Sequence, residues 1–263
     1  MSIQAAFAVH VTRIVQEDPS VIGLAAGGSW ISGEIDEYSD LDLILVTRYK
    51  IAGNKSLMLD TARRFGDLVS GFTGEHVGEP RVLICLYDNP LLHVDIKFLL
   101  PEEFTERVEN PIILFERDEK LSRIIQTTDA RWPQPDFQWI EDRFWTWVHY
   151  ITLKIGRGEL LEACDALSFL RMNVLSPLLQ VKNNRNARGL RKVEMELNST
   201  DLEKLTSTIS AYNRDAILKS LDNCIHTYKN LRHTLFDEQI VLQSRAEKLS
   251  TAYLKQIAGT ASL

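Results

Sequence analysis

The sequence predicts an α+β protein, with a mixed sheet and its helices in the first half and a helical bundle in the second. Three observations support this prediction. Segments that alternate apolar and polar side chains, as strands do, all lie before residue 117. Apolar residues at helical spacing dominate beyond residue 137. Between them, the two prolines of the segment 130–137 mark a boundary, so the expected domains are residues 1–130 and 131–263.

The first domain is expected to combine several helices with one sheet. Apolar residues three or four apart predict the helices, and alternation of apolar and polar residues predicts the strands. The expected helices are 2–17, 55–70, a short one beginning at Pro101 and a turn at 121–127. The expected strands are 21–26, 40–46, 81–87, 91–99 and 112–116. The turn signal at 88–90 makes 81–99 a β-hairpin, whereas the glycine-rich segment 71–80 is expected to be a loop.

The second domain is expected to contain helices and no strands, which predicts a bundle. The expected helices are 137–157, 159–180, 200–210, 213–235 and 237–257. The run 182–197, KNNRNARGLRKVEMEL, is polar and basic and is expected to be a loop. Its Arg188 and Arg191 leave two interpretations open: contact with a nucleotide or acceptor, or a solvated surface loop.

Composition and charge exclude several classes of protein. With 263 residues, 44% of them hydrophobic, the chain can form one large or two ordinary domains. The formal net charge of −6 argues against nucleic acid as a partner and suits a small or cationic acceptor better. No apolar run reaches about 18 residues and the segment 1–20 is too polar for a secretory signal, so no membrane association is expected. Cys85, Cys164 and Cys224 lack metal-ligand spacing, which favours reduced thiols and a cytoplasmic protein.

The segment 24–46, LAAGGSWISGEIDEYSDLDLILV, carries the strongest chemical pattern. Glycines at 27 and 28 followed by Ser29 allow a tight turn whose N–H groups suit phosphate. Asp40 and Asp42 are two residues apart, so in a strand their side chains point to the same face. Two neighbouring carboxylates repel each other unless a positive group lies between them, and a divalent cation is the simplest such partner.

The second strand of the hairpin offers a third carboxylate. His93, Asp95 and Lys97 share one face of the strand 91–99, and apolar residues fill the other. One interpretation is that Asp95 joins the acid pair at a metal site. The other is that the three side chains form a solvated face with local ion pairs.

The segment 24–46 resembles the signature of the polymerase β-type nucleotidyltransferase superfamily. That signature is Gly-Ser, a spacer of about ten residues, and acid-apolar-acid at the head of a strand. The matching residues are Gly28, Ser29, Asp40, Leu41 and Asp42. The run Tyr38–Asp42 has the form common in the antibiotic-modifying branch, and the helical second half is similar to that of aminoglycoside and lincosamide nucleotidyltransferases.

The resemblance implies a fold, an activity and a set of site residues. The expected fold is a polymerase β-like domain followed by a helical bundle. The expected enzyme transfers a nucleoside monophosphate, AMP from ATP, to a hydroxyl of a small molecule and releases pyrophosphate, with antibiotic resistance as its role. Mg²⁺ is expected on Asp40, Asp42 and Asp95, the last of which is also the expected general base. Gly28, Ser29 and Lys154 are expected to bind the phosphates of the nucleoside triphosphate.

The chain departs from its relatives at two positions, which leaves several alternatives open. Ser32 stands where many relatives carry a lysine or arginine, and Trp147 where some carry a glutamate base. Glu141 and Asp142 lie further back, so an acid of the bundle remains an alternative base to Asp95. A non-catalytic nucleotide-binding or regulatory module and a protein-modifying adenylyltransferase are alternative functions. The acceptor, the preferred nucleotide and a homodimeric state are left open.

Overall fold

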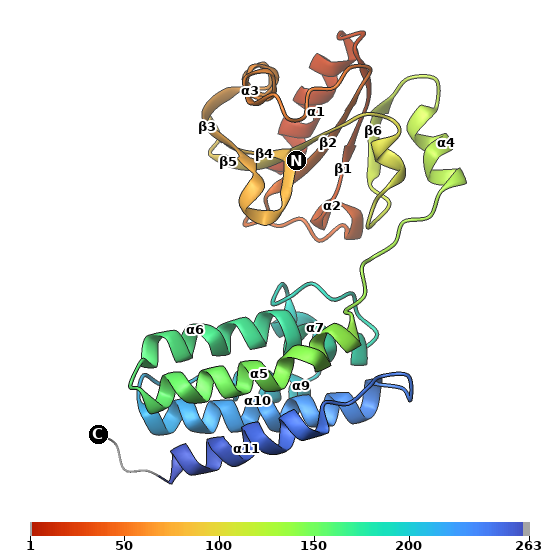
Figure 1. The fold of residues 1–263 in the computed structure, drawn as a ribbon. Coiled ribbons are helices and arrows are strands. Elements are labelled where there is room, and N and C mark those ends of the chain that lie inside the picture. Colours follow the sequence, from red (N-terminus) through yellow and green to blue (C-terminus); the bar gives the residue numbers. More distant parts are fainter. Residues whose placement is uncertain (1, 260–263) are drawn as a thin grey trace. The chain divides into compact units, whose positions relative to one another are not determined.

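The computed structural model describes residues 2–259 and separates the chain into two compact units. The units are Met1–Trp132 and Pro133–Leu263, drawn from red to green and from green to blue in Figure 1. Each has its own hydrophobic core. The division falls within the segment 130–137, where two prolines interrupt regular structure.

The first unit contains a mixed sheet, which in the described residues has six strands in the order β3-β4-β5-β2-β1-β6. The strands are β1 (Val21–Ala26), β2 (Leu41–Thr47), β3 (Asp67–Gly74), β4 (Glu79–Asp88), β5 (Leu92–Leu99) and β6 (Ile112–Glu116). Only the central β2–β5 pairing is parallel; the other neighbouring strands run antiparallel. The helices are α1 (Ile3–Gln16), α2 (Ser29–Ser32), α3 (Lys55–Arg63) and α4 (Lys120–Thr127), with 3₁₀ turns at Glu75–Val77 and Glu103–Thr105.

The two faces of the sheet differ in what covers them. Leu41, Leu43 and Leu45 of β2 are buried in a core that α1 and α3 complete. The opposite face is covered by α4 at the β1–β6 end, where Leu121 packs directly over Gly23 (Figure 1). Along β2 and β5 that opposite face carries the polar side chains, because successive residues of a strand point to opposite sides.

The prediction of a helix over 55–70 and a loop over 71–80 was wrong. The helix ends at Arg63, and β3 follows at Asp67–Gly74. The sequence DLVSGFTG of β3 lacks a clean alternation because this edge strand is mostly exposed. Its backbone hydrogen bonds to β4 stabilise the strand where local propensity does not. The other strands lie within one or two residues of their predicted bounds.

The second unit is helical throughout its regular structure, and the predicted α+β class with a helical C-terminal part is confirmed. Its helices are α5 (Phe137–Gly156), α6 (Leu160–Leu170), a π-helical turn (Arg171–Leu175), α7 (Ser176–Lys182), α8 (Val193–Glu196), α9 (Ser199–Thr206), α10 (Arg214–Leu235) and α11 (Ser244–Ala258). The core forms around the stacked rings of Phe144 and Tyr228, whose centroids are 3.7 Å apart.

Three helices of the second unit differ from their predicted extents. The helix expected at 200–210 ends at Thr206, and the run 182–197, expected to be a loop, contains the short helix α8. The helix expected at 159–180 contains the π-helical turn, after which Pro177 supplies no N–H for the helical ladder. The helix expected at 237–257 begins only at Ser244. The segment before it is irregular, because the backbone N–H of Gln243 donates to Glu141 instead of joining a helix.

Two sequence expectations concern cysteines and membranes. Cys85 and Cys224 are buried free thiols and Cys164 is a half-buried one. Burial raises the pKa of the Cys85 and Cys224 thiols to about 12, so both are inert as nucleophiles near neutral pH.

Across residues 2–259, no helix is both long and apolar enough to cross a membrane.

Candidate functional site

The central feature of the candidate site is a pair of acids on neighbouring strands. In the parallel pairing of β2 and β5, Asp42 lies directly opposite Asp95. Neighbouring strands are about 4.8 Å apart, so the two carboxylates start from adjacent backbone positions. Their strand neighbours Leu41, Leu43 and Val94 are buried in the core, so both acids point to the other face. The structure therefore brings together two of the three acids expected at the site.

The glycine turn after β1 is packed against the first of these acids. The N–H of Gly27 donates to the carbonyl of Asp42 at 2.9 Å. Gly28 has a φ of 57°, and a Cβ atom there would overlap Oδ2 of Asp42. Ser29 follows as the first residue of the one-turn helix α2. Gly28 is therefore required for two reasons, its left-handed backbone and its contact with the carboxylate.

The third expected acid, Asp40, lies just outside the ladder. The strand begins at Leu41, so the alternation of strand side chains does not fix the direction of Asp40. The loop before it is held against α1 by hydrogen bonds. The buried Gln4 on α1 donates to the carbonyls of Asp36 and Ser39 at 3.0 and 2.8 Å. The Ser39 hydroxyl also donates to Asp36 and holds the pKa of that carboxyl below its usual value.

The surroundings of Asp95 are polar and partly charged. Nε2 of His93 lies 3.0 Å from Oδ1 of Asp95, so the imidazole orients the carboxylate. Further along β5, Lys97 contacts Glu79 at 2.8 Å, and Arg81 donates to the same glutamate. Arg81, with help from Lys97, lowers the pKa of Glu79 to about 2 despite partial burial. The ammonium of Lys97 is thus committed to Glu79.

The sixth expected site residue, Lys154, lies on the second unit with acids around it. Its ammonium is 2.6 Å from Glu159 and 3.0 Å from Glu162. These two hydrogen bonds raise the pKa of Lys154 above its usual value. The ring of Tyr150 lies 5.0 Å from the same nitrogen. The structure therefore assigns Lys154 to a local cluster at the end of α5 and the beginning of α6.

Glu141 and Asp142, the bundle acids named as alternative bases, both already accept hydrogen bonds. Glu141 is fully buried and accepts hydrogen bonds from Trp145, Tyr228 and the backbone of Gln243. Asp142 accepts from the amides of Gln138 and Gln243. A base must reach its substrate, and Glu141 has no exposed surface with which to do so.

The two carboxylates fit a divalent cation that takes its remaining ligands from water and substrate. Carboxylate oxygens are the ligands that Mg²⁺ prefers, and this ion commonly binds one or two carboxylates together with water and substrate phosphates. Residues 2–259 contain no group of three His, Cys, Asp or Glu side chains already gathered for a metal. Asp42 and Asp95 fit as the two-carboxylate part of such a site, with Gly28 packed against Asp42.

Some candidate residues had only weak signals in the sequence. His93 was visible as a member of the polar face of its strand, but its contact with Asp95 depends on rotamers. Glu79 lay in a predicted loop, so its role in holding Lys97 could not be inferred. The pairing of Asp42 with Asp95 needed the register of two strands about 50 residues apart, which no local pattern contains.

The chain was compared with protein-family models, curated proteins and solved structures, and the solved structures give matches. No protein-family model matches the chain, and a search of curated proteins finds no match. Among solved structures, the chain is similar to an aminoglycoside 6-adenyltransferase from Bacillus subtilis, at 16% identity and a TM-score of 0.44 over 99% of this chain and 100% of that one. A nucleotidyltransferase-like protein from Exiguobacterium sibiricum 255-15 follows at 10% identity and 0.37, over 97% and 87% of the two chains. A third, the E. coli MS115-1 CdnC:HORMA-deltaN complex, has 11% identity and 0.27, over 97% and 89%.

The first two of these structures belong to the class that the sequence resemblance led us to expect. Their identities are low and their TM-scores lie below 0.5. We therefore base the functional assignment on the acid pair and the glycine turn, and not on these likenesses.

Replacing Gly28 by alanine is expected to reduce activity by displacing the Asp42 carboxylate. Gly33 provides a matched control, because its φ is also positive, at 70°, yet a Cβ there would meet no atom within 4 Å. Gly33→Ala is expected to cost about 1–2 kcal/mol of stability for its left-handed backbone, and Gly28→Ala at least as much because its Cβ would also overlap Asp42. Only Gly28→Ala is expected to lower pyrophosphate release, measured at saturating substrates. Equal activities for the two variants would show that the Gly28–Asp42 contact does not matter to the site.

Proposed function

We propose that this chain is a Mg²⁺-dependent nucleotidyltransferase that moves AMP from ATP onto a hydroxyl group of a small molecule. One observation above all supports the proposal: Asp42 and Asp95 are paired across β2 and β5, with a glycine turn packed against Asp42. A carboxylate pair beside a turn with N–H groups suits a metal-bound polyphosphate.

The proposed reaction is an in-line displacement at phosphorus. The acceptor oxygen attacks the α-phosphorus, the bond to the bridging oxygen of pyrophosphate breaks, and the hydroxyl proton passes to a base. Bound at the acid pair, Mg²⁺ would neutralise phosphate charge and stabilise the leaving pyrophosphate. The protein's own contribution is to position the reacting groups, for which Gly28 and Ser29 would hold the terminal phosphates.

Asp95 is the proposed general base. Its carboxylate lies on the exposed face of the sheet next to Asp42, and His93 holds one of its oxygens at 3.0 Å. That contact would hold the carboxylate in one orientation. The alternative base in the bundle, Glu141, is fully buried and already accepts several hydrogen bonds, which favours Asp95.

The proposed acceptor is a hydroxylated small molecule, and antibiotics of the aminoglycoside and lincosamide types are the first to test. Antibiotic inactivation would be the biological role. The protein would work in the cytoplasm, where ATP and Mg²⁺ are available, without nucleic acid or a membrane as a partner.

The proposal is tested by a pyrophosphate-release screen. The full chain is incubated with Mg²⁺, each of the four ribonucleoside triphosphates in turn, and a panel of aminoglycosides, lincosamides and unrelated polyols. Release is expected with ATP and at least one acceptor, and it is expected to stop when a chelator removes the metal. Nucleotide binding without pyrophosphate release across the whole panel would favour a non-catalytic module instead. Transfer of the nucleotide to an added protein would favour a protein-modifying enzyme.

A further inference from the structure

The second unit contains a groove between its helices α10 and α11. The groove has a volume of about 690 Å³, which is within the range of small-molecule sites. Its walls are one face of each helix, since the lining positions of each helix follow its three-to-four-residue repeat. Because both helices belong to the same unit, the groove does not depend on where the first unit lies.

The two helices that form the groove run antiparallel. Arg214, at the start of α10, donates to the carbonyl of Ile257 near the end of α11. Lys229, further along α10, contacts Glu247 near the start of α11 at 2.7 Å. These two contacts fix which positions of α10 lie opposite which positions of α11.

Two lysines lie on opposite walls of the groove. Lys219 of α10 and Lys255 of α11 are exposed, and the two contacts above place them within about one helical turn of the same level. Among residues 2–259, neither lysine forms an ion pair. Asp222 lines the same groove, so two lysines against one aspartate leave one net positive charge. This charge suits a monoanion better than a polyphosphate.

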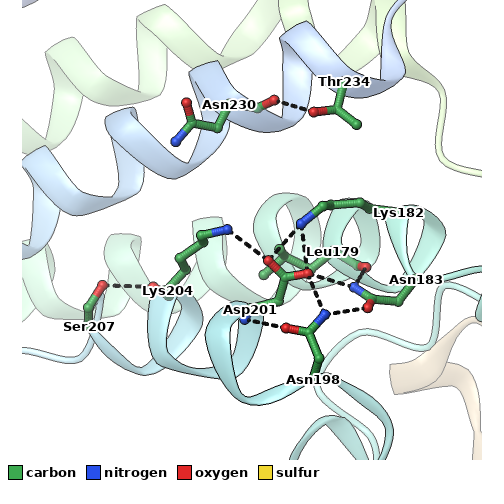
Figure 2. A network of polar contacts seen from close by, with 9 residues as sticks. All are labelled: Leu179, Lys182, Asn183, Asn198, Asp201, Lys204, Ser207, Asn230 and Thr234. Carbon is green, nitrogen blue, oxygen red and sulfur yellow. Dashed lines mark hydrogen bonds and ion pairs between the residues drawn. The ribbon is translucent and has the colours of Figure 1, made fainter.

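Several other lysines of the second unit are already paired with acids. Lys182 and Lys204 donate to the buried carboxylate of Asp201 at 2.8 and 2.9 Å (Figure 2). Burial by itself would raise the pKa of Asp201, but the hydrogen bonds it receives outweigh burial and lower the pKa. In the groove itself, Lys229 is neutralised by Glu247. The two lysines that face each other across the groove differ from these in having no acidic partner within the described part of the chain.

The floor of the groove is apolar. Ile225 of α10 and Leu254 of α11 line it and are 6% and 7% exposed, and the half-buried Leu218 packs against the core of the unit. The hydroxyl of Thr251 donates to the carbonyl of Glu247 at 2.7 Å, so it does not need a partner from a ligand. The groove therefore combines an apolar floor with positive charge on both of its walls.

We propose that the groove between α10 and α11 binds a monocarboxylate with an apolar chain, such as a fatty acid of medium length. The carboxylate lies between Lys219 and Lys255, whose long side chains both reach it. The chain lies on the floor formed by Leu218, Ile225 and Leu254. Removal of the chain from water supplies the affinity, and the two lysines select an anion and orient it.

The test uses decanoate as the probe and isothermal titration calorimetry on the full chain, below the concentration at which decanoate forms micelles. One molecule is expected to bind per chain. Acetate has the charge without the chain, and decyltrimethylammonium has the chain with the opposite charge. Each is expected to bind at least about tenfold more weakly than decanoate. Equal binding of decanoate and decyltrimethylammonium would overturn the proposal, because the lysines would then select nothing.

Three variants test the two walls of the groove. Lys219→Gln/Lys255→Gln removes both lysine charges and is expected to weaken decanoate binding at least about tenfold. The matched control Arg245→Gln/Lys248→Gln removes two charges from exposed positions of α11 that do not line the groove, and a change below about twofold is expected. Asp222→Asn removes the opposing charge and is expected to tighten binding about twofold. Equal affinities for the two double variants would overturn the proposal, because the effect would then depend on net charge alone.

A second copy of the chain is the other occupant that the test separates. Sedimentation velocity is measured for the unmodified chain and for the groove variant, Lys219→Gln/Lys255→Gln. If the variant loses self-association and keeps its affinity for decanoate, the groove is an interface between copies and the proposal is wrong. Several decanoate molecules bound per chain, with one affinity in every variant, would mean non-specific adsorption and would overturn it too. None of these results bears on the acid pair, so the proposed function stands or falls separately.

Discussion

Asp42→Asn is expected to lower metal-dependent pyrophosphate release at least about 1,000-fold, or about 4 kcal/mol of transition-state stabilisation. An amide has the size of a carboxylate but lacks its charge. The substitution therefore removes one of the two negative charges of the Asp42–Asp95 pair. The backbone of Asp42 keeps its place in β2 and still accepts from the N–H of Gly27, so the fold should persist.

Asp67→Asn provides the control for this prediction. Asp67 is an exposed acid at the start of β3 in the same sheet, and the substitution makes the same chemical change. Its expected activity is within about twofold of the unmodified chain, since surface substitutions of this kind are nearly neutral. Both proteins are compared by pyrophosphate release with ATP and Mg²⁺ and by thermal unfolding. Normal turnover by Asp42→Asn would show that the site has been misassigned.

Glu141→Gln is expected to lower the free energy of unfolding of the second unit by about 3 kcal/mol. Oε1 of Glu141 accepts from the indole of Trp145 and the N–H of Gln243, and Oε2 accepts from Tyr228 at 2.5 Å. An amide nitrogen in either oxygen's place would face a donor. Arg232, 3.3 Å away, would lose one of its two counter-charges and keep the other, Glu247 at 2.8 Å.

The measurement is denaturant unfolding followed by tryptophan fluorescence. Three of the five tryptophans, Trp139, Trp145 and Trp147, lie in the second unit, so the signal reports mainly on it. Glu203→Gln on α9 is the control, because Glu203 is exposed and its replacement should change stability by less than about 0.5 kcal/mol. A Glu141 variant as stable as this control would mean that the buried network contributes little net stability.

The sequence was most informative where a face of an element is buried. The leucines of β2 and the apolar residues of β5 alternate so regularly that both strands, and the direction of Asp42 and Asp95, could be predicted. The exposed edge strand β3 offers no such pattern, and its sequence instead predicts a helix end and a loop.

The parts of the candidate sites that could not be predicted depend on contacts between distant residues. Lys154 was expected to bind phosphate, and its contacts with Glu159 and Glu162 could not be inferred from the sequence. The basic run after α7 was recognised, but its fixed shape depends on the buried side chains of Ser176 and Gln180. A polar residue in an apolar stretch does not reveal its partner until the chain has folded.

In the parallel pairing of β2 and β5, the register that buries the apolar side chains is also the register that places Asp42 beside Asp95. If β5 slipped by one residue, Asp95 would turn into the core and Val94 would take its place on the exposed face. Burying a carboxylate without a partner costs several kcal/mol, so such a chain would be unstable as well as unable to pair its acids. A cell that degrades unstable chains would therefore also remove chains in which Asp42 and Asp95 are not paired. Homologues that keep the activity should have no one-residue insertion within either strand.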